Sequence, residues 1–242
     1  LSNKLKKVVI MGKRIIPRAR GRGGPRYRTP SHRFLGRVEY FPIGSFTAKV
    51  VDIMHDPGRS SPVMLIKSED GKEILHIAPE GIQAGDLIRY GDEAKIGNVL
   101  ELEKIPIGTK ISCLETYPGS GPKLCRSSGS YAQVAGTAGD KIIIHLSSGK
   151  EKMFNGRCRA MIGIPAGSGR IEKPWVKVGK KWYAMHARGK IFPRSAGVAM
   201  SPVEHPYGGK KKAVKFKTVS KSAPPGRKIG SISARRTGKR KR

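Results

Sequence analysis

The sequence contains few of the residues on which disulfide scaffolds and metal centres depend. It has three cysteines, Cys113, Cys125 and Cys158, at long and irregular spacings and without a CxxC or HxxxH partner nearby. This number and spacing support neither a disulfide framework nor a zinc site. We therefore expect three small, buried or half-buried thiols in a reducing compartment, and we expect the protein to be cytosolic.

Long apolar runs and aromatic side chains are also scarce. No run of about 18 apolar residues could span a bilayer, and residues 1–11 lack the apolar stretch and small-residue cleavage site of a secretory signal. Aromatic residues make up 6% of the 242 residues, whereas glycine (31) and proline (17) are plentiful. This composition predicts small β modules with many turns, joined to segments that bury little of themselves, and no membrane partner.

Acidic residues are absent from both ends of the chain. The 49 Lys and Arg outnumber the 17 Asp and Glu, which gives a formal net charge of +32. Residues 1–37 contain 12 Lys and Arg, residues 205–242 contain 14, and neither segment contains an acid. Residues 38–115 contain 8 basic and 13 acidic residues, and residues 116–204 contain 15 and 4. Because such a charge would repel itself in a free compact protein, we expect a polyanionic partner, and nucleic acid is the candidate.

The middle of the chain has the alternating pattern of short strands. The first set is predicted at residues 46–53, 63–66, 73–77, 86–90 and 99–102, with Asp70-Gly71 as a hairpin turn. The second is predicted at residues 131–136, 141–146, 150–154, 158–162 and 175–178, and neither set contains a helical stripe. The pattern predicts an all-β protein with an OB-fold barrel at 38–115 and an SH3-like barrel at 116–200. Extended basic arms, 1–37 and 201–242, flank the barrels.

The arms have the composition of segments that bind RNA. Residues 12–33 interleave arginine with glycine and proline and show no apolar periodicity. Glycine lets the backbone approach phosphates, arginine forms paired hydrogen bonds with them, and Tyr27 offers a stacking face. A solvated, disordered tail is the alternative interpretation of such a charge run. For the terminal run, residues 234–242, a nuclear address is a further alternative.

No grouping of side chains indicates catalysis or a cofactor. His55 and Asp56 lie among scattered acids without a Ser/His/Asp or paired-carboxylate arrangement, and His76 and His145 lie within strand patterns where they pack or face solvent. Residues 163–169 only vaguely resemble a phosphate loop, because the GK[ST] ending is missing. We therefore predict no catalytic residue, no metal and no cofactor, and we expect a protein that is not an enzyme.

Residues 197–209, GVAMSPVEHPYGG, are almost uncharged and run directly into a lysine triplet. Their composition fits either a surface loop or a peptide pressed into a crevice of folded RNA. The segment closely resembles GVAMNPVDHPHGG, the signature of the universal family of large-subunit ribosomal protein two. Other stretches that match the family in order are HDPGRS (55–60), IAPEGIQAGD (77–86), GN (97–98) with IPIGT (105–109), SSGSYAQ (127–133) and CRAMIG (158–163). Residues 12–17 and the Arg/Gly stretch after them are similar to the archaeal and eukaryotic branch, and the resemblance covers nearly the whole chain.

The resemblance implies an OB-fold, an SH3-like barrel and terminal extensions threaded into large-subunit ribosomal RNA (rRNA). It implies a structural constituent of the large ribosomal subunit that binds rRNA early in assembly, lies near the peptidyl-transferase region and supports subunit association and translation. Its partners would be this rRNA, neighbouring ribosomal proteins and the small subunit. Ser201 and Tyr207 depart from the signature, which has Asn and His there, so we interpret His205 as a positioning residue. A soluble translation factor with the same two barrels, binding the ribosome transiently, is the alternative.

Charge and resemblance together predict the rRNA-binding residues. Arg59, Arg126 and Arg159 are carried over by motif as contacts from the two barrels. The full predicted set is Arg14, Arg18, Arg20, Arg22, Arg26, Arg28, Arg33, Arg59, Arg126, Arg159, His205, Lys210, Lys211, Lys212, Arg235 and Arg236.

Overall fold

The computed structural model describes residues 15–91, 93–209, 218–224 and 228–234. Its contacts divide the chain into two compact units. The first, which we call the β unit, comprises residues 29–188. The second, the terminal unit, draws on residues 1–28 and 189–242.

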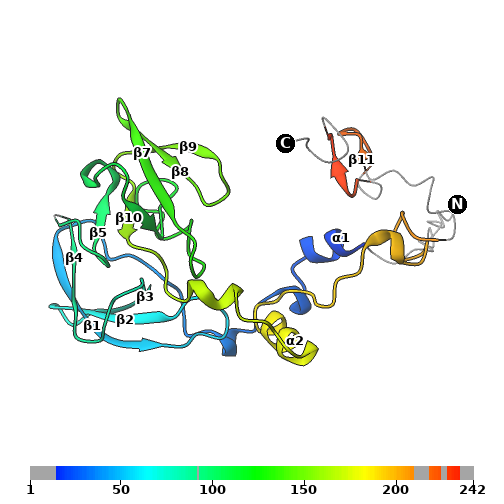
Figure 1. The fold of residues 1–242 in the computed structure, drawn as a ribbon, viewed down its shortest axis with the longest axis horizontal. Coiled ribbons are helices and arrows are strands. Elements are labelled where there is room, and N and C mark those ends of the chain that lie inside the picture. Colours follow the sequence, from blue (N-terminus) through cyan, green and yellow to red (C-terminus); the bar gives the residue numbers. More distant parts are fainter. Residues whose placement is uncertain (1–14, 92, 210–217, 225–227, 235–242) are drawn as a thin grey trace, which may run out of the picture. The chain divides into compact units, whose positions relative to one another are not determined.

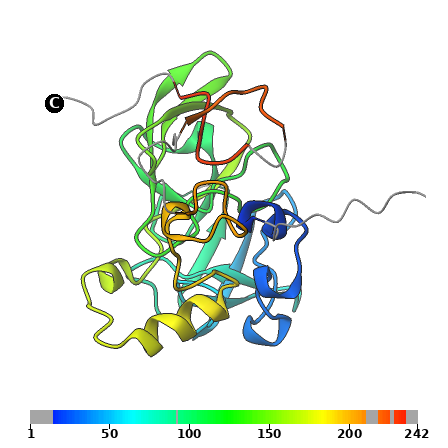
Figure 2. The ribbon, with the colours of Figure 1, turned by 90° about the vertical axis from the view of Figure 1, so that its right-hand side faces the viewer.

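One ten-stranded sheet runs through the described residues of the β unit, in the order β3-β2-β1-β4-β5-β10-β6-β7-β8-β9. Its strands are β1 (Phe46–Met54), β2 (Val63–Ser68), β3 (Glu73–Ile77), β4 (Leu87–Tyr90), β5 (Val99–Glu101), β6 (Lys110–Ser112), β7 (Ala132–Ala138), β8 (Lys141–His145), β9 (Glu151–Asn155) and β10 (Arg159–Ile162). In Figures 1 and 2 the green strands β7–β9 stand above the cyan strands β1–β3, so the sheet bends strongly between its two halves. The sequence predicted an all-β protein; the structure is mostly β and also contains helices α1 (Ile16–Gly21) and α2 (Val178–Ala187).

Two hydrophobic cores form because alternate residues of these strands face inward. The first core is built around Val50, Ile66 and Ile88, all fully buried. The second is built around Ile111 and Ile144. Strand β10 connects the two halves, because it pairs antiparallel with β5 on one side and with β6 on the other. All four residues of β10 are buried.

The predicted turn at Asp70-Gly71 is confirmed, and a second glycine closes the β8–β9 hairpin. Gly71 adopts φ +80° and donates its N–H to the carbonyl of Ser68 at 2.9 Å, which closes the β2–β3 turn. Gly149 adopts φ +74° and donates to the carbonyl of Leu146 at 2.8 Å between β8 and β9. Both positions need the left-handed conformation that glycine adopts without steric penalty.

Three local predictions were wrong or incomplete. Residues 175–178 do not form a strand: Val176 has φ +59°, and helix α2 (Val178–Ala187) begins directly after it. Only Ala187 of α2 is buried, so this helix left no apolar stripe in the sequence to find. The three-residue strand β6 was missed because it is too short to show alternation.

The N-terminal arm is not wholly extended. Helix α1 (Ile16–Gly21) has a proline in its first turn, where the missing N–H is tolerated. The 3-10 turns η1 (Pro25–Tyr27) and η2 (Ser31–Arg33) follow. The terminal unit also contains η5 (Gly197–Ala199) and a short parallel pair, β11 (Thr218–Val219) with β12 (Ser231–Ile232). Two further 3-10 turns, η3 (Leu102–Lys104) and η4 (Ser168–Ile171), lie in the β unit.

Candidate nucleic-acid interface

Arg59 is held by the loop between β1 and β2. The carboxylate of Asp56, which is fully buried, accepts hydrogen bonds from the Arg59 guanidinium and, at 2.8 Å, from the N–H of Gly58. A second nitrogen of the guanidinium donates to the carbonyl of Gly36. A Cβ at Gly58 would lie 2.8 Å from that of Phe34, so only glycine allows the loop to pack this tightly. The loop therefore fixes the direction of Arg59 before any ligand arrives.

Arg126 lies in the loop between β6 and β7 and reaches the same region. Its guanidinium donates to the carbonyl of Pro122 at 3.0 Å. The backbone N–H of Ser128 donates to the hydroxyl of Ser60 at 3.1 Å, which ties this loop to the one that carries Arg59. Two motifs that lie more than sixty residues apart in the chain are thus joined directly.

Arg59, Arg126 and Arg159 all line one hollow of about 260 Å³, which we call the basic hollow. Arg37, Lys123 and residues 119–121 line it as well. The one carboxylate in its lining belongs to Glu39, which lies 3.0 Å from Arg37. Pockets for organic ligands usually measure roughly 300–1,000 Å³ and are mostly apolar. A smaller, strongly cationic hollow suits an anionic group such as a phosphate.

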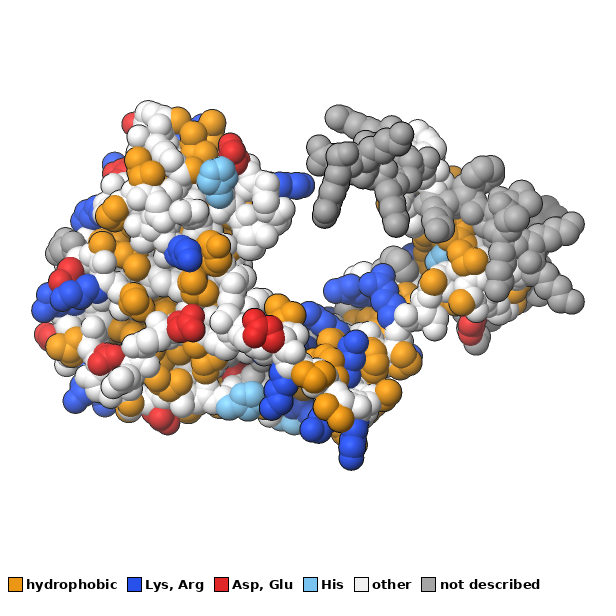
Figure 3. Space-filling model, viewed as in Figure 1, with side chains coloured by type: hydrophobic (Ala, Val, Ile, Leu, Met, Phe, Trp, Pro, Cys, Tyr) orange, Lys and Arg blue, Asp and Glu red, His pale blue; other side chains and the backbone are white. Residues whose placement is uncertain are grey.

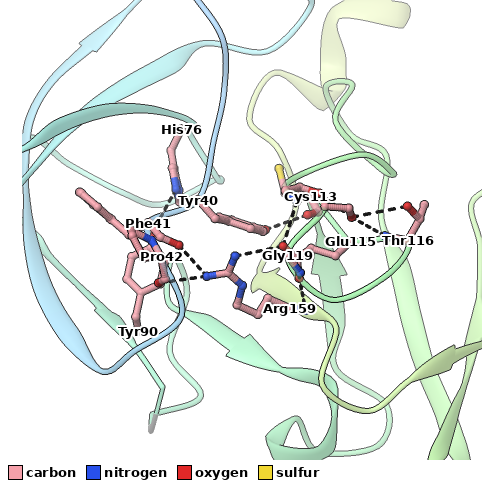
Figure 4. Close-up of polar contacts among 12 residues, drawn as sticks. Tyr40, Phe41, Pro42, His76, Tyr90, Cys113, Glu115, Thr116, Gly119 and Arg159 are labelled. Atoms are coloured by element: carbon pink, nitrogen blue, oxygen red, sulfur yellow. Dashed lines mark hydrogen bonds and ion pairs between the residues drawn. The ribbon is translucent and has the colours of Figure 1, made fainter.

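Arg159 has more internal partners than a solvent-facing contact would have (Figure 4). Its guanidinium pairs with Glu115 at 3.1 Å and donates to the carbonyls of Phe41 at 2.7 Å and Pro42 at 3.3 Å. The guanidinium also lies 5.2 Å from the centre of the Tyr40 ring. Only 10% of the side chain is exposed. Arg159 therefore ties β10 to the segment before β1. The RNA contact predicted for it can involve only the edge of the guanidinium that faces the basic hollow.

The residues around Arg159 form a buried polar network between the two cores. The Tyr40 hydroxyl donates to the carbonyl of Cys113 at 2.8 Å, and the Tyr90 hydroxyl lies 2.7 Å from Nε2 of His76. Burial, then the charge of Arg159, lowers the pKa of His76 to about 3, although a hydrogen bond with the backbone of Glu39 opposes this. His76 is thus a neutral packing residue, as predicted. Burial also raises the pKa of the Cys113 thiol to about 12.

The other thiols and His145 also have the environments predicted for them. Cys158 is buried and Cys125 is half-buried. Burial raises the pKa of both thiols. His145 is half exposed, and its Nδ1 lies 3.6 Å from Oε1 of Glu151.

The structure adds two arginines that lie outside every motif. Arg170, in η4, donates its Nε–H to the hydroxyl of Ser128. Arg188, which caps α2, donates to the carbonyl of Arg59 at 3.3 Å. Burial and the charge of Arg170 lower the pKa of Arg188. The pair extends the positive surface beside the loops of Arg59 and Arg126, and only the fold could have revealed it.

The basic arm residues are described in part. Arg18, Arg20, Arg22, Arg26 and Arg28, all in the terminal unit, are exposed, whereas Arg33 in the β unit is half-buried. Arg14, Lys210, Lys211, Lys212, Arg235 and Arg236 lie outside the described residues. The exposed arginines leave their guanidinium groups available to an anionic partner.

The loop at residues 197–209 folds onto itself around His205. Nδ1 of His205 accepts a hydrogen bond from the N–H of Tyr207 at 3.1 Å, so the proton of the neutral ring is on Nε2. Burial lowers the pKa of His205. A Cβ at Gly197 would collide with the imidazole, and one at Gly208 would collide with the carbonyls of Met200 and Ser201. The Tyr207 hydroxyl donates to the carbonyl of Ile229 at 3.1 Å. The ring is therefore held in one orientation.

In the part of the chain that the structure describes, no three His, Cys, Asp or Glu side chains gather in a way that could hold a metal ion. Within the same described ranges, no helix has the length and apolar character needed to cross a membrane.

Comparison with known proteins gives one consistent result. Residues 12–90 match the family described as Ribosomal Proteins L2, RNA binding N-terminal domain, and residues 95–228 match Ribosomal Proteins L2, C-terminal domain. Proteins named Large ribosomal subunit protein uL2 are similar over almost the full length. The one from Methanothermobacter thermautotrophicus is 49% identical over 96% of this chain and 100% of its own. Those from Archaeoglobus fulgidus and Methanocaldococcus jannaschii are each 48% identical, with the same coverage.

Proposed function

Because the chain belongs to the ribosomal protein L2 family, we propose its function from that premise and from the geometry of the basic hollow. It is a structural, non-enzymatic protein of the large ribosomal subunit, and it binds ribosomal RNA. The observation that carries the mechanism is the convergence of Arg59 and Arg126, from loops far apart in sequence, on one cationic hollow. Fixed guanidinium groups hold a phosphate at a defined position, which is how backbone contacts set the register of a nucleic acid.

The fold proposed for the two halves of the β unit is an OB-fold at residues 38–115 and an SH3-like barrel at residues 116–200, with arms at 1–37 and 201–242. Two separate cores within one bent sheet support this division. In this proposal the barrels recognise the shape of a folded RNA, since A-form helices are read mainly by form and by 2′-hydroxyl contacts. The exposed arginines of the arm, Arg18 to Arg28, neutralise phosphates and release counterions.

The proposed location follows the family resemblance: near the peptidyl-transferase region, beside neighbouring ribosomal proteins and facing the small subunit. His205 is proposed to position RNA rather than to transfer protons. Its hydrogen bond from Tyr207 and its lowered pKa both favour a neutral ring, and such a ring can stack on a base or donate from Nε2. Because Nδ1 already accepts from Tyr207 and Nε2 carries the proton, neither ring nitrogen offers the free lone pair that a general base needs.

The test of the hollow is a comparison of Arg126→Ala with Arg89→Ala in the full chain. Arg89 is an exposed arginine on β4 that pairs with Glu93 at 3.2 Å, away from the hollow. Binding is measured to a large-subunit rRNA fragment and to random RNA of equal length. Arg126→Ala should reduce the ratio of the two affinities about tenfold, the effect of losing one charge-assisted hydrogen bond of about 1.5 kcal/mol. Equal ratios for Arg126→Ala and Arg89→Ala would contradict the assignment.

The alternative of a transient translation factor is separated by sedimentation. A structural protein stays with large subunits through a high-salt wash, because the shape contacts of its folded barrels with RNA persist when salt weakens the phosphate contacts. A factor that binds transiently is released by the same wash.

A further inference from the structure

Helix α2 and the residues just before it present aromatic rings to solvent. Trp182 is 41% exposed, Tyr183 is 64% exposed, and Trp175 is 40% exposed. Three large aliphatic side chains nearby, Ile171, Val176 and Val178, are exposed as well. A soluble protein rarely exposes so many large apolar groups together unless they contact a partner.

Two of the rings, those of Trp182 and Tyr183, contact each other on the helix. Trp182 stacks on His186, with ring centres 5.0 Å apart and planes 10° apart. Tyr183 meets Trp182 edge-on at 4.9 Å and 89°. Ala187 is the one buried residue of α2, and Arg188 anchors the end of the helix to the carbonyl of Arg59. The helix is therefore fixed at its C-terminal end while its aromatic residues stay accessible.

The charge around these rings has one sign. Residues 173–188 contain no acid, and their cations are Lys173, Lys177, Lys180, Lys181 and Arg188. Figure 3 shows orange and blue side chains alternating over the place where Figure 1 draws α2. Cations favour a polyanion, and flat aromatic faces favour flat apolar groups. An RNA strand with unpaired bases supplies both, because every base has a π-face and every nucleotide a phosphate.

We propose that Trp175, Trp182 and Tyr183, here called the aromatic platform, stack on unpaired bases of RNA while the neighbouring lysines contact its phosphates. The inference rests on the proposed function, since it assumes that the partner is RNA, and it adds a second mode of recognition. The basic hollow binds a phosphate whatever the base attached to it, whereas the platform requires a base that is unpaired and unstacked. Single-stranded loops and bulges are the RNA elements that offer such bases.

The tryptophans make a direct test possible. The chain has two, Trp175 and Trp182, and both belong to the platform, so tryptophan emission reports on it alone. The probes are a short single-stranded oligoadenylate and an abasic oligomer of equal length, which carries the same phosphates without bases. Binding of each to the full chain is followed by fluorescence anisotropy of a dye on the oligomer and by tryptophan emission. Oligoadenylate should bind and quench the emission; the abasic oligomer should bind without quenching.

Variants separate stacking from loss of structure. Trp182→Ala should weaken oligoadenylate binding about tenfold, within the range for one base on one aromatic ring, and should leave abasic binding unchanged. Trp182→Phe should keep most of the affinity, whereas Trp182→Leu should behave like alanine, because a base stacks on a ring and not on an aliphatic chain. Leu87→Ala removes a comparably exposed apolar side chain from β4 and should change nothing.

The outcomes also distinguish the platform from the function on which it rests. Oligoadenylate that binds without changing tryptophan emission would overturn the platform and leave RNA binding intact. Failure of both oligomers and of rRNA fragments to bind would overturn the proposed function as well. Quenching by an acidic polyglutamate as strong as that by oligoadenylate would assign the platform to an acidic protein partner and contradict base stacking.

Discussion

Four hydrogen bonds end on the carboxylate of Glu115, which is fully buried. Its oxygens accept from the backbone of Gly119 at 3.3 Å, of Gly121 at 3.0 Å and of Arg159 at 3.0 Å, and from the Arg159 guanidinium at 3.1 Å. Removing one partner of such a pair leaves a buried charge uncompensated, which usually lowers stability by about 3–5 kcal/mol. The pair thus holds the loop at 119–121, and with it one wall of the basic hollow.

We expect Glu115→Ala to lower the free energy of unfolding by about 3 kcal/mol or more, measured by urea denaturation of the free chain. The double variant Glu115→Ala with Arg159→Ala should lose less than the sum of the single losses, because neither charge is then left alone. Glu73→Ala is the matched control: it removes an exposed pair with Lys67 at 3.2 Å and should lose less than about 1 kcal/mol. Equal losses for Glu115→Ala and Glu73→Ala would show that the buried pair does not stabilise the fold.

His76 gives the stability of the chain a dependence on pH. Its pKa in the folded state is about 3, well below the ordinary 6.5. Protonation therefore favours the unfolded chain, so this stability is fully present above about pH 6.5 and is lost as the pH falls toward the folded pKa. The slope should approach about 1.4 kcal/mol per pH unit. This slope is measured from urea denaturation midpoints between about pH 6.5 and 5, above the range where carboxylates titrate. In His76→Gln most of this slope should disappear, leaving the part from His205, whose pKa burial also lowers; a slope that stays as steep would point to another group.

At the scale of elements, strands were predictable where their residues alternate over a hairpin. Residues 73–77 were predicted as a strand and are strand β3, because the Asp70-Gly71 turn fixes where the strand begins. Helix α2 was not predictable, since Ala187 is its one buried residue and Arg188 holds its end, so no apolar stripe marks it in the sequence. Strand β6 forms because β10 and β7 pair with it on either side. Its three residues are too few to reveal this pairing in the sequence.

The site was predictable in its members but not in their arrangement. Family motifs identified Arg59 and Arg126, and the structure places both in one hollow because Ser60 and Ser128 join their loops. Glu115, the ionic partner of Arg159 inside the protein, is 44 residues away in sequence. Arg170 and Arg188 belong to no motif and meet these loops only after folding. Local pattern therefore predicts which residues are charged, while long-range packing decides which of them are exposed and which act together.

At the scale of the whole molecule, charge is concentrated in two acid-free segments. Residues 1–37 and 205–242 contain 26 of the 49 Lys and Arg, whereas residues 38–115 contain more acid than base. Affinity that comes from neutralising phosphates depends strongly on salt and little on sequence. Specificity needs groups with fixed positions, such as Arg126 in the basic hollow. Affinity and specificity should therefore respond to different substitutions.

The last prediction separates these two contributions in the full chain. Changing six arm residues to glutamine (Arg18, Arg20, Arg22, Lys210, Lys211 and Lys212) should flatten the plot of log affinity against log salt concentration. The expected change in slope is about 4–5, since each phosphate contact contributes about 0.7–0.9. The ratio of affinities for an rRNA fragment and for random RNA should hardly change. In the control, Lys67→Gln with Lys72→Gln, both cations lie beside acids at the β2–β3 hairpin, and the slope should stay as it is. An unchanged slope in the six-residue variant would move the phosphate contacts from the arms to the β unit, where Arg37, Lys123 and Arg170 would be the next residues to replace.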